Sequence, residues 1–591
     1  MIIPPMMTSR LFFSLLACLA FISTPCIAKK PNIVVILTDD QGWGDLSLHG
    51  NKNLSTPNLD RLAKEGAQFD RFYVCPVCSP TRAEFLTGRY HQRGGVYSTS
   101  AGGERLDLDE HTIADSFKAA GYATGAFGKW HNGMQYPYHP NGRGFEEFYG
   151  FCSGHWAHYF SPMLEHNGRI TKGKGFIIDD LTNKAMEFME ANTKANKPFL
   201  AYLPYNTPHS PMQVPDQYWD RHSNNKLAQR SANPDRETIN HTRAALAMCE
   251  NIDWNVGRVL KKLDELGIAE NTVVVFFHDN GPNGWRWNDG MRGIKGSTDE
   301  GGVRSPLFVR WQKKITPGTM IKPIGSAIDL FPTLADLAGV DVKSDRPLDG
   351  KSLKPLLTDE KADWNERIVI NSWRKHVSAR NQRFRLDSQG RLYDMVADPK
   401  QTTDVSKKFP AETKKLAAEV QKYRKNVMSE IGKDKRPFLV GHPDYPNTQV
   451  PARDGIPHGG IKRSSRHPNC SHFLNWKKTD DQVTWEIEVV ESGIFEVDLY
   501  YTCPKEDVGS TLELSFNDTT IKTKITEAFA PPYIAGPADR HKRTEGDDKE
   551  WKAMSMGTIK LSKGKGTLTL QATDIPRASA MDFRLLMLKR K

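Results

Sequence analysis

Runs of consecutive apolar residues, separated by segments with helical periodicity, fill the first part of the chain. The apolar runs occupy residues 32–37, 123–127, 199–203 and 272–277. Short continuous runs of this kind are typical of strands that are buried on both faces. Between them, Thr56-Pro57 begins a predicted helix that ends at Gly66, and another helix is predicted at about 112–120. The alternation predicts an α/β domain with a largely parallel central sheet flanked by helices.

Two different patterns follow this domain. Residues 341–432 combine short apolar runs with apolar positions at helical spacing near 416–427, which predicts a small C-terminal α+β subdomain. Residues 433–468 are rich in Pro, Gly, His and Lys and predict a linker or an extended wrap. Residues 469–591 alternate apolar and polar positions, as in Trp485-Glu486-Ile487-Glu488-Val489, and predict an added all-β sandwich module.

The N-terminus, residues 1–28, has the pattern of a signal peptide. Arg10 precedes an apolar run at 11–22, and a small residue stands before a pair of lysines. Because the run is too short to span a membrane, we expect export to the periplasm or the extracellular space, with a mature catalytic domain at 29–340. A lipoprotein signal anchored at Cys18 is the alternative, but the residues after Cys18 stay apolar, which favours plain export.

Composition and charge narrow the class of partner. A chain of 591 residues exceeds what one core organises, which agrees with several domains. The net charge of +11 fits either a soluble basic surface or attraction to polyanions such as sulfated glycans. Nucleic acid is not an expected partner, since the chain carries an export signal and no known binding motif. No later segment has the length of a transmembrane span. Six cysteines lie outside the signal, and their spacing does not fix any pairing.

Polar clusters follow four of the predicted strands where these strands end. They are Asp39-Asp40, Lys129-Trp130-His131, His209, and Asp279-Asn280. In open α/β sheets ligands bind beyond the carboxyl ends of the strands, so the clusters are expected to meet on one rim. Three carboxylates and one amide oxygen suit a hard cation such as Ca²⁺ or Mg²⁺. No group of thiols or imidazoles has the spacing of a zinc site.

The most specific motif runs from Cys78 to Arg89 and reads Cys-Ser-Pro-Thr-Arg-Ala-Glu-Phe-Leu-Thr-Gly-Arg. It resembles the signature of the sulfatase family, Cys-x-Pro-x-Arg followed by Leu-Thr-Gly-Arg. A second family signature is matched around Lys295, and a late landmark is matched at 392–399. The resemblance covers about residues 31–432 and implies a formylglycine-dependent, arylsulfatase-like enzyme of the alkaline-phosphatase-like superfamily.

The resemblance assigns a role to each matched position. In this family a formylglycine-generating enzyme oxidises the cysteine, which makes Cys78 the precursor of the nucleophile and a metal ligand. The remaining metal ligands would be Asp39, Asp40, Asp279 and Asn280, with one divalent cation, Ca²⁺, as the expected ion. The other catalytic residues would be Arg82, Lys129, His131, His209 and Lys295. Ser153 matches a family serine near the sulfate only loosely, and Asn132 stands where leucine is more usual.

The expected chemistry uses these residue types because negative charge grows on the leaving oxygen as the sulfate S–O bond breaks. The resemblance implies that the hydrated aldehyde of residue 78 attacks sulfur in line and that its second hydroxyl then expels sulfate. Arg82 would support this hydrate, and His131 would assist its proton transfers. The remaining cationic positions, Lys129, His209 and Lys295, would hold the sulfate oxygens, and we expect them to face a solvent-accessible cleft.

Two other functions stay open from the sequence. One is a phosphonate or phosphate ester hydrolase of the same superfamily, although phosphatase relatives typically use two zinc ions and several histidines. The other is a non-catalytic protein that binds sulfated glycans, which would be expected to lose the cysteine or a metal ligand. The chain keeps Cys78 and all of the oxygen ligands, which favours the sulfatase.

The natural substrate, a sulfated carbohydrate or an aryl sulfate, is left open as well. Loops at 148–162 and 284–288 are expected to line the specificity pocket. Four aromatic residues of the β module either stack on sugar rings or pack inside the sandwich, namely Trp485, Tyr500, Tyr501 and Tyr533.

Overall fold

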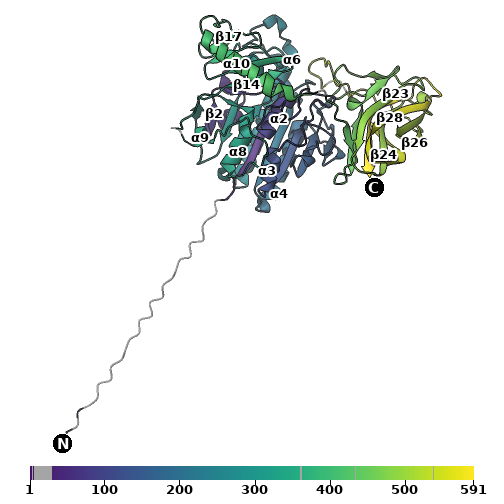
Figure 1. Ribbon diagram of the computed structural model, residues 1–591, viewed down its shortest axis with the longest axis horizontal. Helices are drawn as coiled ribbons and strands as arrows, with labels where there is room; N and C mark the ends of the chain where they lie inside the picture. The colour runs from purple at the N-terminus through teal and green to yellow at the C-terminus, as the bar shows by residue number, and fades with distance from the viewer. Residues whose placement is uncertain (3, 5–28, 360–361, 433, 535, 537) are drawn as a thin grey trace.

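The chain forms two lobes that lie side by side (Figure 1). The computed structural model describes residues 1–591 apart from 3, 5–28, 360, 361, 433, 535 and 537. The signal peptide expected at 1–28 therefore falls almost wholly outside the described residues. Within the described part of the chain, no helix combines the length and the apolar character that a membrane crossing requires.

The larger lobe is built on a ten-stranded sheet. In sheet order its strands are β12 (Thr319–Ile321), β2 (Ala67–Phe69), β11 (Leu307–Arg310), β9 (Thr272–His278), β1 (Asn32–Asp39), β8 (Phe199–Pro208), β4 (Ala123–Lys129), β5 (Glu147–Phe151), β6 (Met163–His166) and β7 (Arg169–Lys172). The five central strands, β9 to β5, run parallel to one another. The predicted α/β fold with a largely parallel central sheet is confirmed, and the four strands expected from the apolar runs are neighbours at its centre.

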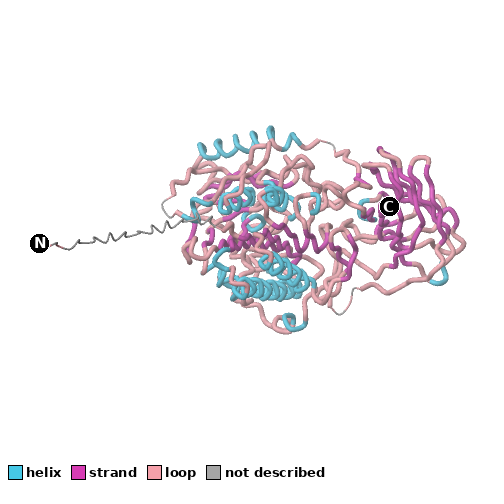
Figure 2. Tube along the Cα trace, turned by 90° about the horizontal axis from the view of Figure 1, so that it is seen from below, coloured by secondary structure: helices cyan, strands magenta, loops and turns pink. Residues whose placement is uncertain are grey.

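Helices cover both faces of this sheet (Figure 2). One face packs against α1 (Pro57–Lys64), α4 (Ile177–Lys194), α5 (Asp216–Trp219) and α6 (Ile239–Glu265). The other packs against α2 (Cys78–Thr87), α3 (Ile113–Ala119), α8 (Leu330–Ala338) and α9 (Lys354–Thr358). In β1, Val34 and Ile36 enter the first core while Val35 and Leu37 enter the second. Because both faces are covered, the strand reads as a continuous apolar run.

A small α+β unit follows, as expected from the periodicity near 416–427. Its antiparallel sheet consists of β14 (Val369–Trp373), β15 (His376–Arg380), β16 (Phe384–Leu386) and β17 (Leu392–Asp394). Helix α10 (Pro410–Asn426) packs on it through Leu416, Val420 and Tyr423. A separate three-stranded sheet joins β10 (Arg304–Ser305), β3 (Phe72–Tyr73) and β13 (Gly325–Ser326). A short helix, α7 (Glu300–Val303), precedes β10.

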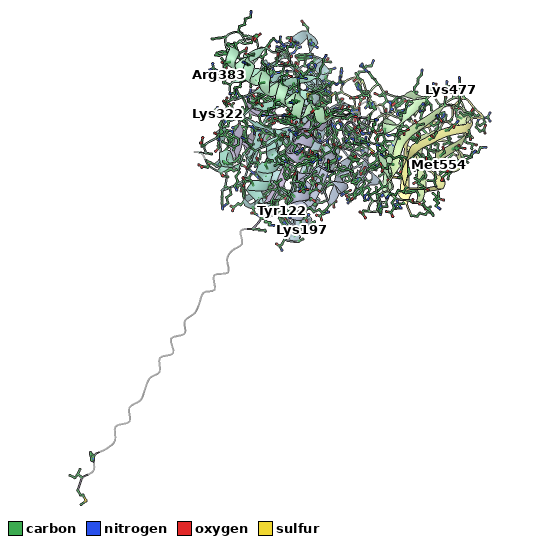
Figure 3. The ribbon with its side chains drawn as sticks, in the orientation of Figure 1. Tyr122, Lys197, Lys322, Arg383, Lys477 and Met554 are labelled. Atoms are coloured by element: carbon green, nitrogen blue, oxygen red, sulfur yellow. The ribbon has the colours of Figure 1, made fainter. Side chains whose placement is uncertain are left out.

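The smaller lobe is a sandwich of two six-stranded sheets. The first contains β18 (Phe438–Val440), β20 (Ile456–His458), β23 (Gln482–Val489), β25 (Thr511–Phe516), β26 (Thr519–Lys524) and β28 (Gly564–Asp574). The second contains β19 (Asn447–Pro451), β21 (Lys462–Arg463), β22 (Phe473–Leu474), β24 (Gly493–Thr502), β27 (Lys552–Leu561) and β29 (Asp582–Arg590). Figure 3 marks Lys477 and Met554 on this lobe and Lys322 and Arg383 on the larger one.

Four of these strands come from 433–468, the segment that the sequence predicted as a linker or an extended wrap. Short apolar runs such as Phe438-Leu439-Val440 pair with the edges of the sandwich sheets. Proline is compatible with this arrangement because Pro451 ends its strand and Pro457 lies on an edge strand. The segment is therefore extended along the sandwich and forms part of its sheets.

The aromatic residues of the sandwich divide into two groups. Trp485 and Tyr501 are buried in its core, while Tyr500 and Tyr533 are partly exposed. The six cysteines among the described residues are buried free thiols, so no disulfide links the elements that these residues form.

Candidate active site

Four neighbouring strands deliver polar side chains to one rim of the central sheet. Strands β1 and β9 run in register, with Thr38 opposite His278, so that the residues following them emerge side by side. Lys129 ends β4 and His209 follows β8, the two strands on the other side of β1. The convergence that the strand ends predicted is therefore present in the structure.

The acidic residues that follow β1 and β9 are linked directly. The backbone N–H of Asp40 donates to Asp279 Oδ1 at 3.1 Å, and Asn280 Nδ2 donates to Asp40 Oδ1 at 2.8 Å. Asp40 has a φ of 65°, a left-handed conformation that non-glycine residues rarely adopt. Ligand atoms of Asp39, Cys78 and Asp279 all lie within 4.8 Å of one another. The site thus brings the carboxylates of Asp39 and Asp279 next to residue 78, and Asp40 adjoins both of these carboxylates.

Each carboxylate is paired with a different cation. Lys129 Nζ lies 2.6 Å from Asp39 Oδ2, and Arg82 Nη2 lies 2.9 Å from Asp279 Oδ2.

The third pair joins Lys295 Nζ to Asp40 Oδ1 at 2.7 Å, and His209 Nε2 lies 3.6 Å from the other oxygen of Asp40. Because isolated buried charges are costly, these pairs allow three carboxylates to share one buried site.

The pKa values reflect the competition between burial and these charges. Burial would raise the pKa of Asp39, but Lys129 and its other cationic neighbours hold it far below its usual range. Burial, together with the negative charge of Asp39, raises the pKa of Asp279 to about 7 despite the opposing charge of Arg82. A cation bound beside Asp279 would lower this pKa, because it stabilises the charged form of the carboxyl.

The donor set fits a hard divalent cation. Asp39 Oδ1 and Asn280 Oδ1 are buried and have no hydrogen-bond partner among the described residues. Buried oxygens of this kind require a partner, and carboxylate and amide oxygens are the preferred ligands of Ca²⁺ and Mg²⁺. The oxygen donors able to hold the ion are Asp39, Asp40, Asp279 and Asn280, and Cys78, the fifth ligand expected from the sequence, lies beside Asp39 and Asp279.

Helix α2 places Cys78 in this cluster as its first residue. One turn later Arg82 lies on the same face of the helix, and its Nη1 also donates to Lys129 O at 2.7 Å. Thr81 Oγ1 donates to Asp279 O at 2.6 Å. These bonds dock the helix on the ends of β4 and β9. The sequence analysis assigned no helix here, although Pro80 in the first turn is a recognisable signal.

Two histidines complete the site in different ways. His131 has a φ of 66°, and its Nε2 lies 2.9 Å from Thr99 O. Burial, followed by the charge of Lys129, lowers the pKa of His131 well below its usual value, so it is neutral. His209 lies with its Nδ1 3.4 Å from the Nδ1 of His155, a buried histidine that the sequence analysis did not select. His155 follows β5 by only a few residues, which is the signal that would have identified it.

The expectation of a solvent-accessible position is wrong for Lys129, which is 0% exposed. His209 is 7% exposed, and the side chain of Lys295 is 19% exposed. Lys129 is tolerated inside the protein because Asp39 neutralises it. His209 is therefore buried as well, and Lys295 is the most accessible of the three groups.

Several contacts at the site were not predictable from strand ends. Arg286 binds both carboxylate oxygens of Asp45 and donates from Nη2 to Asp40 O at 2.8 Å, which fixes the turn after β1. Asn132, at the position where leucine is more usual, lies with Nδ2 3.3 Å from Ser79 O. Ser153 Oγ donates to Asn469 O of the sandwich lobe at 2.7 Å.

Comparison with known proteins identifies the family. The model of the sulfatase family matches residues 31–340, and a model described as N-sulphoglucosamine sulphohydrolase, C-terminal, matches 295–429. The chain therefore belongs to the sulfatase family. The sandwich lobe from 469 onward lies outside both matches.

Curated relatives and solved structures agree with this family. N-acetylgalactosamine-6-sulfatase of Mus musculus is 34% identical over 363 residues, which cover 56% of this chain and 66% of that protein, just under two thirds. Uncharacterized sulfatase YdeN of Escherichia coli (strain K12) is 33% identical over 56% of this chain and 67% of that protein. The crystal structure of Ps i-CgsB in complex with k-i-k-neocarrahexaose superposes with a TM-score of 0.61 at 31% identity, covering 67% of this chain and 92% of that chain.

The burial of Lys129 yields a stability prediction. Lys129→Met leaves the Asp39 carboxylate buried without its nearest cation, so the free energy of unfolding is expected to fall by about 3 kcal/mol or more. Lys194→Met removes an exposed ion pair with Glu190 and should change the free energy of unfolding by less than about 0.5 kcal/mol. Urea unfolding in the presence of a chelator measures both values. Adding Asp39→Asn to Lys129→Met should recover part of the loss, and equal effects of the two lysine variants would contradict the buried pairing.

A buried carboxyl on the opposite side of α2 leads us to expect that the free energy of unfolding depends on pH. Glu84 faces Cys75 and His91 away from the cation cluster, and burial raises its pKa from 4.5 to about 8. Since the folded state keeps a proton that the unfolded state loses above pH 4.5, this carboxyl lowers the free energy of unfolding as the pH rises toward 8.

Glu84→Gln removes this titration. The free energy of unfolding of Glu84→Gln minus that of the parent should therefore increase between pH 5 and pH 8, by at most about 1.4 kcal/mol per pH unit. Urea unfolding at four pH values measures the difference, and a difference that stays constant with pH would show that Glu84 is ionised in the folded protein.

Proposed function

We propose that this protein is an exported sulfatase that hydrolyses sulfate esters of a sulfated carbohydrate. The observation that carries the proposal is the cluster of three buried carboxylates paired with three cations, with residue 78 beside Asp39 and Asp279. Membership of the sulfatase family supports it. So do the name N-acetylgalactosamine-6-sulfatase of one relative and the k-i-k-neocarrahexaose bound to another. Residues 1–28 support export through the signal-peptide pattern.

The nucleophile in this proposal comes from Cys78. A formylglycine-generating enzyme would oxidise the thiol during maturation, and the resulting aldehyde would supply, as its hydrate, a hydroxyl for attack on sulfur. Cys78 is positioned for this role at the start of α2, among Asp39, Asp279 and Arg82. Arg82 spans from Asp279 to the end of β4 and therefore holds positive charge close to residue 78.

The oxygens of the sulfate group would be held by Lys295 and His209. Both residues contact Asp40, so each would be able to turn a donor toward an entering anion. Lys129 contributes its charge from within the fold. His131 Nδ1, which has no hydrogen-bond partner among the described residues, would accept a proton from a hydroxyl at residue 78. The negative charge that develops on the leaving oxygen is stabilised most in a site from which water is excluded.

A divalent cation, Ca²⁺ by preference, would be held by Asp39, Asp40, Asp279 and Asn280. It would supply positive charge that stabilises sulfate oxygens and the ionised form of the nucleophile. The partnerless oxygens of Asp39 and Asn280 support this assignment.

Maturation and turnover test the proposal together. The chain produced with a formylglycine-generating enzyme should carry a residue 78 that is about 18 Da lighter than cysteine, because CHO replaces CH₂SH. The matured protein should hydrolyse 4-nitrophenyl sulfate and N-acetylgalactosamine 6-sulfate, and Cys78→Ala should abolish this turnover. Cys75→Ala, which removes a buried thiol outside the cluster, serves as the matched control and should retain turnover. Peptide mass spectrometry and sulfate release measure the outcomes.

Two results would contradict the proposal. Unmodified Cys78 in fully active protein would exclude the formylglycine route. Faster turnover of 4-nitrophenyl phenylphosphonate than of any sulfate ester would assign the site to phosphonate hydrolysis instead.

Cation binding has a test that does not depend on activity. Ca²⁺ at a hundredfold its dissociation constant should stabilise the Cys78→Ala protein by about 2.7 kcal/mol, which raises the melting temperature. Asp39→Asn should remove most of this increase because it replaces a charged ligand. Asp253→Asn, which alters a buried carboxyl on α6, should keep it. Calorimetry with Ca²⁺, Mg²⁺ and a chelator measures the shift, and stoichiometric zinc in the purified protein would overturn the assignment.

A further inference from the structure

A cavity of about 640 Å³ lies between the two lobes. One wall consists of residues from 156–163 and 170–172 of the larger lobe. The other consists of Tyr500 and residues from 529–534 and 548–551 of the sandwich lobe. We call it the interlobe cleft. Its volume falls in the range of pockets that bind small ligands, about 300–1,000 Å³.

Partly exposed aromatic side chains dominate the interlobe cleft. Trp156 and Phe160 belong to the larger lobe, and the other four rings belong to the sandwich lobe, namely Tyr500, Phe529, Tyr533 and Trp551. None of the six is fully buried, and Tyr533 is 43% exposed, whereas Trp485 and Tyr501 pack inside the sandwich. Rings that are left partly exposed in a concave site offer flat apolar faces, which suit the apolar faces of sugar rings.

Charged side chains lie among these rings. Lys549 Nζ lies 4.8 Å from the ring centroid of Tyr533, and Trp551 Nε1 donates to Asp548 Oδ1 at 2.7 Å. Lys172 Nζ lies 3.3 Å from Glu550 Oε1 at an exposed position. Hydroxyl groups of a sugar can exchange hydrogen bonds with the carboxylates, and the lysines attract anionic substituents. The cleft therefore combines the two kinds of group that a sulfated glycan requires.

The interlobe cleft adjoins the active site through two loops. In the larger lobe, Trp156 directly follows His155, whose Nδ1 is 3.4 Å from His209 Nδ1. In the sandwich lobe, Glu545 Oε1 lies 3.7 Å from His155 Nδ1, and Asp548 follows three residues later, at most about 10 Å along the chain. Arg543 Nη1 donates to Ala157 O at 3.0 Å and joins the loops. Each loop thus has one end at the active-site histidines and the other in the cleft.

We propose that the interlobe cleft binds the sugar residues that neighbour the sulfated residue in a sulfated oligosaccharide. The sulfate group enters the cation cluster, and the chain of sugars continues past His155 onto the rings of the cleft. The proposal rests on the proposed function for the sulfate end of the ligand. It makes the sandwich lobe, which lies outside the matched family regions, part of the substrate site.

Binding to the full chain carrying Cys78→Ala tests the proposal without turnover. The probes are two hexasaccharides, k-i-k-neocarrahexaose and one that contains N-acetylgalactosamine 6-sulfate, compared with the monosaccharide N-acetylgalactosamine 6-sulfate. One hexasaccharide is expected to bind at least tenfold more tightly than the monosaccharide by isothermal titration calorimetry. Trp551→Ala and Tyr533→Ala should each remove most of that gain, while Trp551→Phe, which keeps a ring, should retain part of it.

Trp254→Ala is the matched control, because Trp254 is a 43% exposed aromatic residue on α6 that does not line the cleft. It should leave the tenfold gain unchanged. Melting temperatures check that each variant is folded, and Tyr533→Ala provides the test if Trp551→Ala is unstable.

The results separate this proposal from the proposed function. Equal affinity for hexasaccharides and monosaccharide, or an undiminished gain in both alanine variants, would overturn the cleft proposal even if 4-nitrophenyl sulfate is hydrolysed by the unmutated chain. The matured chain could instead bind a hexasaccharide tightly through Tyr533 and Trp551 but hydrolyse no sulfate ester. That result would support the cleft proposal and overturn the proposed function.

Discussion

The structure depends on how negative charge is neutralised at the carboxyl ends of the central strands. Asp39, Asp40 and Asp279 are each fully buried, and each is within 3 Å of a different cation. Removing a single charge from water costs several kcal/mol, so the site is stable only if all of the partners are in place together. The partners come from β4, α2 and the loop that carries Lys295, which means that the fold must assemble before the cluster can.

This constraint explains the spacing of the signature motif in physical terms. Cys78 and Arg82 are four residues apart in α2, and therefore lie on the same face of the helix, toward the acidic cluster. Thr81 donates a hydrogen bond to the backbone carbonyl of Asp279 and thereby fixes the position of the helix relative to the sheet. Pro80 is tolerated in the first turn because its missing N–H would have no partner within the helix. The motif thus supplies the residues that dock one helix on two strand ends.

The pattern of apolar residues was sufficient to predict the fold class. Strands β1, β4, β8 and β9 are buried on both faces, so each can be recognised from a short apolar run in its own sequence. The convergence of Asp39 and Asp279 followed from the same topology. Other features depend on partners that are distant in sequence. The burial of Lys129 requires Asp39, and the strands in 433–468 require sandwich edges that come later in the chain. No local pattern encodes such pairings, so these features were not predicted.

The contacts between the lobes also depend on the pairing of buried charges. Arg453 of the sandwich lobe is buried against Glu104 and also lies 2.9 Å from its own neighbour Asp454. Its Nη1 donates to Ser153 Oγ at 2.9 Å, in the loop that follows β5. A buried arginine with these partners resists separation of the lobes, because separation would leave Glu104 without its partner. The loop after β5 is therefore held from two sides, by the sheet that supports the cation cluster and by the sandwich. A rearrangement of the sandwich would consequently be transmitted to Ser153 and His155, although the strand ends that carry Asp39 and Asp279 would stay fixed by the sheet.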